Sequence, residues 1–170
     1  MKFLKYFFLS IIVFSVFCAV AGIRINTSKS IPVGIYRTCK APVEKGAFVL
    51  FCPPPGLVFD MAKERGYIAG GFCPGGYGYM MKGIAATEGD IVTVHDDGVR
   101  VDGILLPHSM PLKVDPAGRS LPYLPADTYT LDNSELFLMS DACSISFDGR
   151  YFGPINRSQI KTVIQPVFAW

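Results

Sequence analysis

Charged residues are scarce in this sequence, and outside its first five residues neither sign is in excess. Only 18% of the 170 residues are Asp, Glu, Lys or Arg, whereas half are hydrophobic. Without Lys2 and Lys5, the 16 basic residues fall to 14, which equals the number of acidic residues. A neutral domain without a basic stretch interleaved with aromatic residues lacks the electrostatic signature of nucleic-acid binding. We therefore expect no nucleic-acid partner.

The sequence also lacks the usual signals of a metal or cofactor site. Its only histidines are His95 and His108, and no two cysteines have the C-x-x-C spacing of a zinc site. The glycine-rich segment 70–78 has no Lys-Ser/Thr ending and no G-x-G-x-x-G leading into a helix, as a phosphate-binding loop would have. We expect neither a metal nor a cofactor.

An apolar run fills residues 6–22, interrupted only by Ser10 and Ser15. As a helix, this run reaches roughly 25 Å, the short end of a bilayer span. We expect residues 1–23 to be a signal anchor, with the two N-terminal lysines on the cytoplasmic side and residues 24–170 forming the domain outside it. The alternative is a cleavable signal peptide with Ala19-Val20-Ala21 as the cleavage site.

Four cysteines follow this segment and are expected in an oxidising compartment, where disulfides form. They are Cys39, Cys52, Cys73 and Cys143. Four cysteines allow three full connectivities, and the sequence alone does not choose among them. The pair Cys52–Cys73 is favoured because these two residues bracket a segment rich in proline and glycine.

Short runs of branched and aromatic residues, separated by turn signals, predict many short strands. The expected strands cover residues 33–38, 46–52, 79–86, 91–94, 99–101, 104–106, 129–131, 136–139 and 160–168, the last interrupted at Pro166. One short helix is expected over 57–65, and residues 107–127 are expected to form a long surface excursion. The pattern indicates an all-β domain, mainly β with one or two short helices.

Two segments carry candidate chemistry. Ser30 lies just beyond the apolar run, on a segment that Pro32 and Gly34 suit to a sharp turn. Lys82 lies inside an apolar run, where desolvation lowers the pKa of an amine and leaves a fraction of it neutral. A neutral lysine can take a proton from a serine hydroxyl, so the pair predicts a Ser-Lys hydrolase. The alternative for Lys82 is a strand lysine whose stem covers apolar surface while its head reaches water.

A third segment, residues 140–153, is dense in small polar residues. We expect Ser146 to hydrogen-bond and orient the lysine amine, and Asp148 and Arg150 to form an ion pair that supports the loop. Ser28 precedes Ser30 by two residues, so both side chains point the same way if the segment is extended. The Ser28 hydroxyl would then donate to an oxyanion beside the Ser30 N–H.

Taken together, the three ordered segments resemble the conserved boxes of the type I signal peptidases, and most closely the conjugative-transfer signal peptidases of the TraF type. The matching motifs are Ser-Ile-Pro-Val-Gly-Ile-Tyr, Phe-Cys-Pro-Gly-Gly-Tyr-Gly-Tyr-Met-Met-Lys and Ser-x-Asp-Gly-Arg-Tyr-Phe-Gly-Pro-Ile. The resemblance implies a signal-peptidase-like compact β domain behind an N-terminal membrane helix. It also implies that Ser30 is the nucleophile, Lys82 the general base and Ser146 the group that orients the lysine. Asp148 and Arg150 would be the supporting acid and arginine, and Ser28 would supply the hydroxyl beside the oxyanion hole.

The function implied by the resemblance is that of an endopeptidase of the inner membrane, with a single span and a periplasmic catalytic domain. Its expected substrate is the pilin precursor of a conjugative type IV secretion system, which such enzymes in some systems also close into a ring. Other proteins of the conjugation apparatus are expected partners. Two alternatives stay open: a general type I leader peptidase, and a non-catalytic envelope assembly protein with the same fold.

Overall fold

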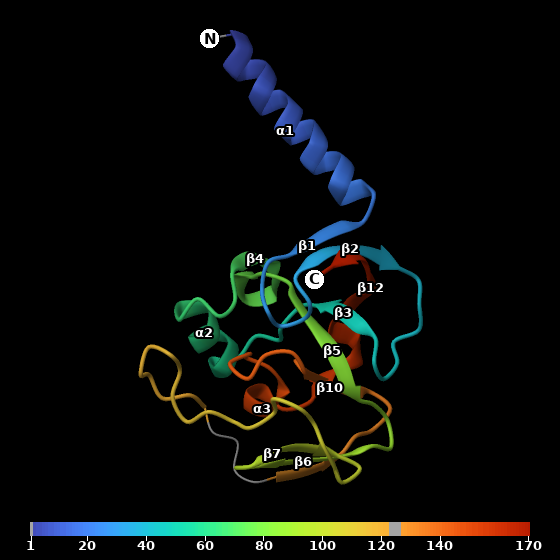
Figure 1. Ribbon diagram of the computed structural model, residues 1–170, viewed down its shortest axis with the longest axis vertical. Coiled ribbons are helices and arrows are strands. Elements are labelled where there is room, and N and C mark those ends of the chain that lie inside the picture. The colour runs from blue at the N-terminus through green and yellow to red at the C-terminus, as the bar shows by residue number, and fades with distance from the viewer. Residues whose placement is uncertain (1, 123–126) are drawn as a thin grey trace.

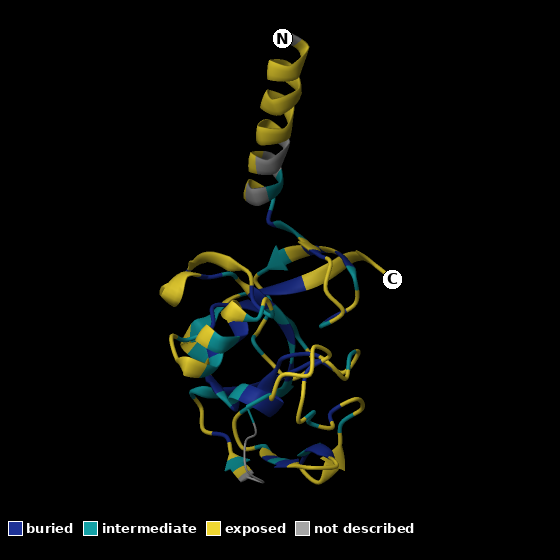
Figure 2. Ribbon diagram, turned by 90° about the vertical axis from the view of Figure 1, so that its left-hand side faces the viewer, coloured by how far each residue is buried: buried dark blue, intermediate teal, exposed yellow. Residues whose placement is uncertain are grey.

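A computed structural model describes the backbone of residues 2–122 and 127–170. One helix, α1 (Lys2–Val20), projects from one end of a domain built mainly of strands (Figure 1). The large apolar side chains of α1 that are described are mostly exposed, including Phe3, Phe7 and Ile12 (Figure 2). Thus the helix expected in the N-terminal segment is present. Within the described part of the chain, however, no helix has the length and apolar character needed to cross a membrane, so the expected transmembrane span is not supported.

Among the residues described, all strands except one form two antiparallel sheets. The larger sheet has the order β1-β2-β12-β3-β5-β10-β11. Its strands are β1 (Ile23–Asn26), β2 (Gly34–Cys39), β3 (Phe48–Phe51), β5 (Met80–Ala86), β10 (Glu135–Met139), β11 (Ile155–Asn156) and β12 (Ile160–Ala169). The smaller sheet has the order β8-β7-β6-β9. Its strands are β6 (Ile91–His95), β7 (Gly98–Val101), β8 (Ile104–Leu105) and β9 (Asp127–Thr130).

Short helical elements and one further strand complete the described part of the domain. They are α2 (Leu57–Glu64), β4 (Gly70–Cys73), α3 (Gly149–Phe152) and the 3-10 turns η1 (Pro74–Gly76) and η2 (Arg157–Gln159). This confirms the expected mainly-β domain with few short helices. The excursion after β8 contains one isolated bridge, Val114 to Ser120, over the residues described, and residues 123–126 lie outside them.

Several elements were not expected from the sequence. β1 directly follows the apolar run, so its residues carry no separate strand signal, and it pairs with β2. α3 is a single turn, whose N-cap Asp148 accepts from the Arg150 N–H. The expected interruption at Pro166 is wrong, because β12 continues through it with a shift of register between Pro166 and Phe168. Such a bulge lets a strand accommodate a residue that cannot donate to the ladder.

Aromatic packing in the hydrophobic core fixes the loop that carries Ser146. Phe147 stacks on Tyr151 at a centroid distance of 5.8 Å and meets the edge of Phe59, on α2, at 6.3 Å. Contacts of this kind contribute about 0.5–1.5 kcal/mol each beyond the area they bury. The main chain next to Ser146 is therefore anchored in the core.

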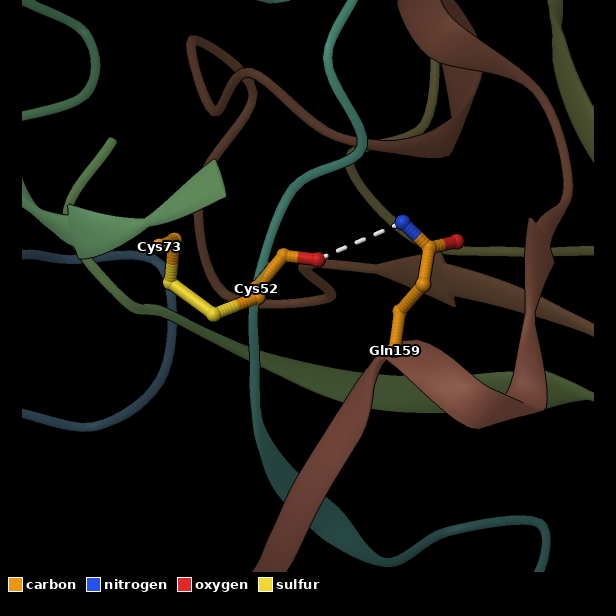
Figure 3. Close-up of a disulfide and its surroundings, with 3 residues drawn as sticks. All are labelled: Cys52, Cys73 and Gln159. Carbon is orange, nitrogen blue, oxygen red and sulfur yellow. Dashed lines mark hydrogen bonds between the residues drawn. A yellow bond between two sulfur atoms is a disulfide. The ribbon is translucent and has the colours of Figure 1, made fainter. Parts of the chain in front are cut away.

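A disulfide joins Cys52, at the end of β3, to Cys73, at the end of β4 (Figure 3). This confirms the favoured pairing. The Cys52 carbonyl also accepts a hydrogen bond from the Gln159 amide at 3.3 Å, so the same residue is tied to the turn before β12. Cys39 and Cys143 are free thiols, as is Cys18 on α1.

Candidate active site

Ser30 lies in a loop of residues 27–33 that joins β1 to β2, here named the Ser30 loop. The Oγ of Ser30 accepts a hydrogen bond from the Ser146 Oγ at 3.3 Å. Ser146 comes from the segment after β10, more than a hundred residues further along the chain. The fold therefore brings together the first and third of the segments selected from the sequence.

Lys82 supplies the second segment to the same place. Side chains on β5 alternate between the two faces of the sheet, and Lys82 shares the buried face with Met80 and Ile84. Only 2% of its surface is exposed. Its Nζ donates to the Ser146 Oγ at 2.5 Å. The Ser146 hydroxyl thus bridges the amine of Lys82 and the hydroxyl of Ser30, and the snorkelling alternative for Lys82 is wrong.

Burial changes the acid–base properties of this amine. Desolvation, the largest effect, lowers the pKa of Lys82 from 10.5 to about 8. The carboxylate of Asp148 and the Cys143 thiol act in the opposite direction, while the Arg150 guanidinium adds to the lowering. Near pH 8 about half of the amine is therefore neutral and able to accept a proton.

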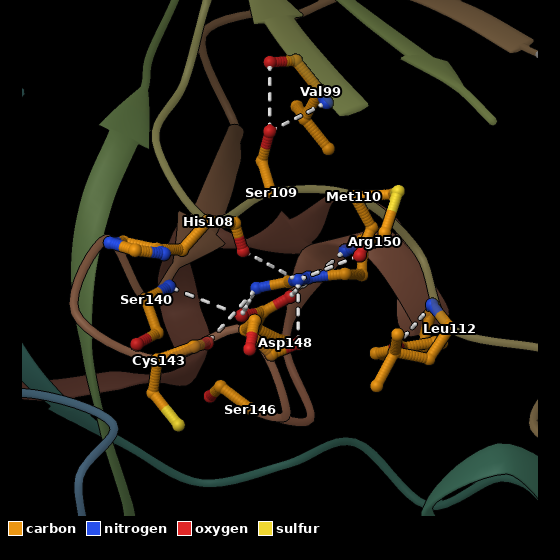
Figure 4. Close-up of polar contacts among 12 residues, drawn as sticks. Val99, His108, Ser109, Met110, Leu112, Ser140, Cys143, Ser146, Asp148 and Arg150 are labelled. Atoms are coloured by element: carbon orange, nitrogen blue, oxygen red, sulfur yellow. Dashed lines mark hydrogen bonds and ion pairs between the residues drawn. The ribbon is translucent and has the colours of Figure 1, made fainter. Parts of the chain in front are cut away.

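A buried ion pair holds the loop that presents Ser146. The expected pair is present: Arg150 donates from Nε and Nη2 to the two carboxylate oxygens of Asp148, at 2.7 and 2.9 Å. Both side chains are fully buried. Asp148 also accepts from the Ser140 N–H at 3.2 Å (Figure 4). The remaining donor capacity of Arg150 is directed at main-chain oxygens, those of His108, Met110, Cys143 and Ser144. One guanidinium therefore connects the segment between β10 and α3 that contains Ser146, here named the Ser146 loop, to the start of the excursion.

The three side chains face a cavity of about 290 Å³. Most of its lining is apolar, and the excursion forms one wall of it. The lining residues are Lys29, Ser30, Tyr67, Met80, Lys82, Leu112, Asp115, Pro116, Leu121, Cys143, Ile145, Ser146, Phe147 and Tyr151. A concave apolar site with a few convergent polar groups is the usual form of a binding site.

Sequence reasoning missed the part of this wall that Asp115 organises. Its carboxylate accepts from the Tyr67 hydroxyl, from Arg119 Nε at 2.6 Å and from the Ala117 N–H at 2.9 Å. The hydrogen bond from Tyr67 contributes most to holding the pKa of Asp115 well below its usual value. The signal available in the sequence was the turn pattern Asp115-Pro116-Ala117-Gly118, typical of an Asx turn.

Ser28 occupies a different position from the one expected. Its Oγ donates to the Asn26 Oδ1 at 2.9 Å, and Ser28 is not among the residues that line the cavity. Asn26 was not selected from the sequence at all. It is buried at the end of β1, and its amide donates to the carbonyl oxygens of three residues of the Ser30 loop, Ser28, Ile31 and Pro32.

Known proteins resemble this chain over most of its length. The model of the family described as signal peptidase, peptidase S26, matches residues 1–170. A signal peptidase I crystal structure from Enterococcus faecalis V583 overlaps 73% of this chain and 97% of its own, with a TM-score of 0.40 and 18% identity. A plasmid transfer protein TraF of Escherichia coli is 68% identical over 150 residues, which are 88% of this chain and 84% of that protein. A conjugal transfer protein TraF of Agrobacterium tumefaciens (strain 15955) is 37% identical over 151 residues, again 88% and 84%. The chain therefore belongs to the peptidase S26 family of signal peptidases, as a member of the TraF type.

Proposed function

We propose that this protein is a serine endopeptidase in which Ser30 is the nucleophile and Lys82 the general base. The observation that carries the proposal is the chain of contacts from the buried Lys82 amine through Ser146 to the half-buried Ser30, at the wall of a cavity. A lysine whose pKa is about 8 is about one-tenth neutral at pH 7, far more than an ordinary lysine. Such a base activates a serine hydroxyl as histidine does in triads.

The proposed reaction begins with transfer of the Ser30 proton. Rotation of two hydroxyls makes Ser30 donate to Ser146 and Ser146 donate to the neutral amine of Lys82. The Ser30 proton then passes to the Ser146 oxygen while the Ser146 proton passes to the amine of Lys82. The Ser30 oxygen attacks the scissile carbonyl. The resulting ammonium returns a proton to the leaving amine, which leaves an acyl-enzyme. Attack by water releases the acid, whereas attack by a peptide amine gives a new peptide bond.

Other residues are assigned supporting roles. Ser146 relays the proton and orients the amine, and the pair Asp148–Arg150 holds Ser146 in place. We assign the oxyanion to the backbone N–H of Ser30, because donors aimed at the developing charge contribute strongly to catalysis. Ser28 would join it only after its hydroxyl leaves Asn26.

The proposed substrate is the pilin precursor of a conjugative type IV secretion system. Support comes from the relatives, which are named as plasmid and conjugal transfer proteins.

The test is the intact mass of the pilin subunit in cells that carry the conjugation system, with either the wild-type chain or Ser30→Ala. Wild type should give only the shortened mass and Ser30→Ala only the precursor. Shortened pilin in both strains would favour the non-catalytic assembly role. Precursors of many exported proteins accumulating with Ser30→Ala would favour a general leader peptidase.

We also propose that α1 attaches the domain to the periplasmic face of the inner membrane. The exposed apolar side chains of α1 and the disulfide Cys52–Cys73 support this placement. In fractionated cells the protein should sediment with the inner membrane, and external protease should digest the domain in spheroplasts. Recovery in the soluble cytoplasmic fraction would refute the proposal.

A further inference from the structure

Asn26 makes an unusual number of contacts for a single amide. Its Nδ2 lies 2.8 Å from the Ser28 carbonyl oxygen, 2.9 Å from that of Ile31 and 3.0 Å from that of Pro32. Its Oδ1 accepts from both the N–H and the hydroxyl of Ser28, at 3.1 and 2.9 Å. The side chain is 5% exposed. The amide therefore binds both sides of Ser30 in sequence, residue 28 before it and residues 31 and 32 after it.

Two contacts hold the same loop from outside. The Tyr36 hydroxyl donates to the Pro32 carbonyl at 2.6 Å, and the Trp170 N–H donates to the Val33 carbonyl at 3.0 Å. The last residues of β12 also run so close to β2 that a Cβ on Gly34 would lie 2.2 Å from the Phe168 carbonyl oxygen. The loop thus has a polar centre, Asn26, and a packed outer side.

We propose that Asn26 is a positioning residue, which holds Ser30 in the geometry for attack before any substrate binds. The inference rests on the proposed role of Ser30. It follows from the hydrogen bonds of the loop, because without the Asn26 amide the carbonyl oxygens of residues 28, 31 and 32 lose their donor. A loop relaxed toward other conformations moves Ser30 Oγ away from Ser146 and from the reacting carbonyl. Misplacement of a reacting group by about 1 Å costs on the order of 100-fold in rate.

The test compares two chemically identical substitutions. Asn26→Asp keeps the acceptor oxygen but replaces the donor of three hydrogen bonds by a second oxygen that repels the carbonyls. Asn156→Asp makes the same change at an exposed N-cap of η2, where the side chain only accepts, from the Ser158 N–H. Cleavage of a pilin-precursor peptide, thermal unfolding and amide hydrogen exchange are measured for the wild type and both variants.

For Asn26→Asp we expect kcat to fall about 100-fold with KM changed less than threefold. Exchange should rise in peptides that cover residues 27–33, while peptides from β5 and β10 keep their protection. Asn156→Asp should match wild type in every measurement. A merely structural residue would instead lower activity only in proportion to the unfolded fraction, with exchange rising across the sheet.

Tyr36→Phe keeps the test informative if Asn26→Asp does not fold. It removes only the hydroxyl that binds Pro32, and we expect a smaller loss of kcat, about tenfold, with raised exchange in the same loop. The proposal is overturned if a folded Asn26→Asp keeps the kcat of wild type, or if both variants leave exchange of residues 27–33 unchanged. A wild-type protein that cleaves nothing would reject the proposed function instead, and the exchange measurements would still decide whether Asn26 orders the loop.

Discussion

Replacement of Lys82 by methionine is expected to abolish most cleavage and at the same time to stabilise the fold. Loss of a general base costs about 10²–10⁴-fold in rate. The buried ammonium, however, is unfavourable: the drop of its pKa from 10.5 to about 8 corresponds to about 3 kcal/mol at neutral pH. Methionine fills a similar space without charge and forfeits about 1 kcal/mol with the hydrogen bond to Ser146. The net gain in unfolding free energy is therefore about 2 kcal/mol.

The gain in unfolding free energy is expected to depend on pH. Because the pKa of Lys82 is lower in the folded protein than in the unfolded chain, the unfolded chain binds more protons between pH 8 and 10.5, and wild type gains stability as pH rises through that window. The advantage of Lys82→Met should thus be complete below about pH 8 and vanish near pH 10, and above pH 10.5 the variant should be less stable than wild type by about 1 kcal/mol, because of the lost hydrogen bond. Urea unfolding at several pH values measures it, with the exposed Lys161→Met on β12 as control. A destabilised Lys82→Met at pH 7 would contradict the assignment of a penalised buried charge.

Replacement of Arg150 by methionine is expected to produce the largest loss of stability, about 3–5 kcal/mol. The loss arises because Asp148 would be left as a buried carboxylate without its cation. The carbonyls of His108 and Ser144 would also lose their donor. Chemical unfolding of the purified domain measures the change. Since the Ser146 loop is held by the same guanidinium, cleavage should be lost as well.

An exposed ion pair supplies the matched control. Arg100 donates to Asp97 in the same bidentate fashion on β7, but both side chains are partly exposed. Such pairs contribute little because water and salt screen them, so Arg100→Met should cost far less than Arg150→Met. The double variant Asp148→Asn with Arg150→Met removes the unpaired charge and should recover part of the loss. Equal costs at the two arginines would show that burial of the Asp148–Arg150 pair is not what matters.

The sequence predicted well those features that depend on residue type within a short segment. Ser30 and Lys82 were selected because a serine on a constrained turn and a lysine in an apolar strand are unusual in themselves. The period-2 pattern of β5 places Lys82 on the buried face, and the small polar residues around Ser146 indicated a loop near it. The bracketing of a proline-rich segment by Cys52 and Cys73 was enough to favour their disulfide.

Features that depend on how a loop closes on itself, or on contacts between distant segments, were not predictable in this way. Asn26 looked like an ordinary residue after an apolar run, because its five hydrogen bonds exist only once the Ser30 loop has closed around it. The excursion carries no periodicity, so nothing in it indicated that Leu112 and Asp115 line the cavity. Ser28 was placed by assuming an extended segment, whereas both its N–H and its hydroxyl donate to the Asn26 Oδ1.

The rate at which Ser30 is acylated, measured as a function of pH in single turnovers of a pilin-precursor peptide, tests the central claim most directly. If the amine of Lys82 must be neutral, the rate should rise about tenfold for each pH unit below 8 and level off above it, in line with the lowered pKa. A rate that stays constant between pH 5 and pH 9 would show that Ser30 does not depend on Lys82 as its base.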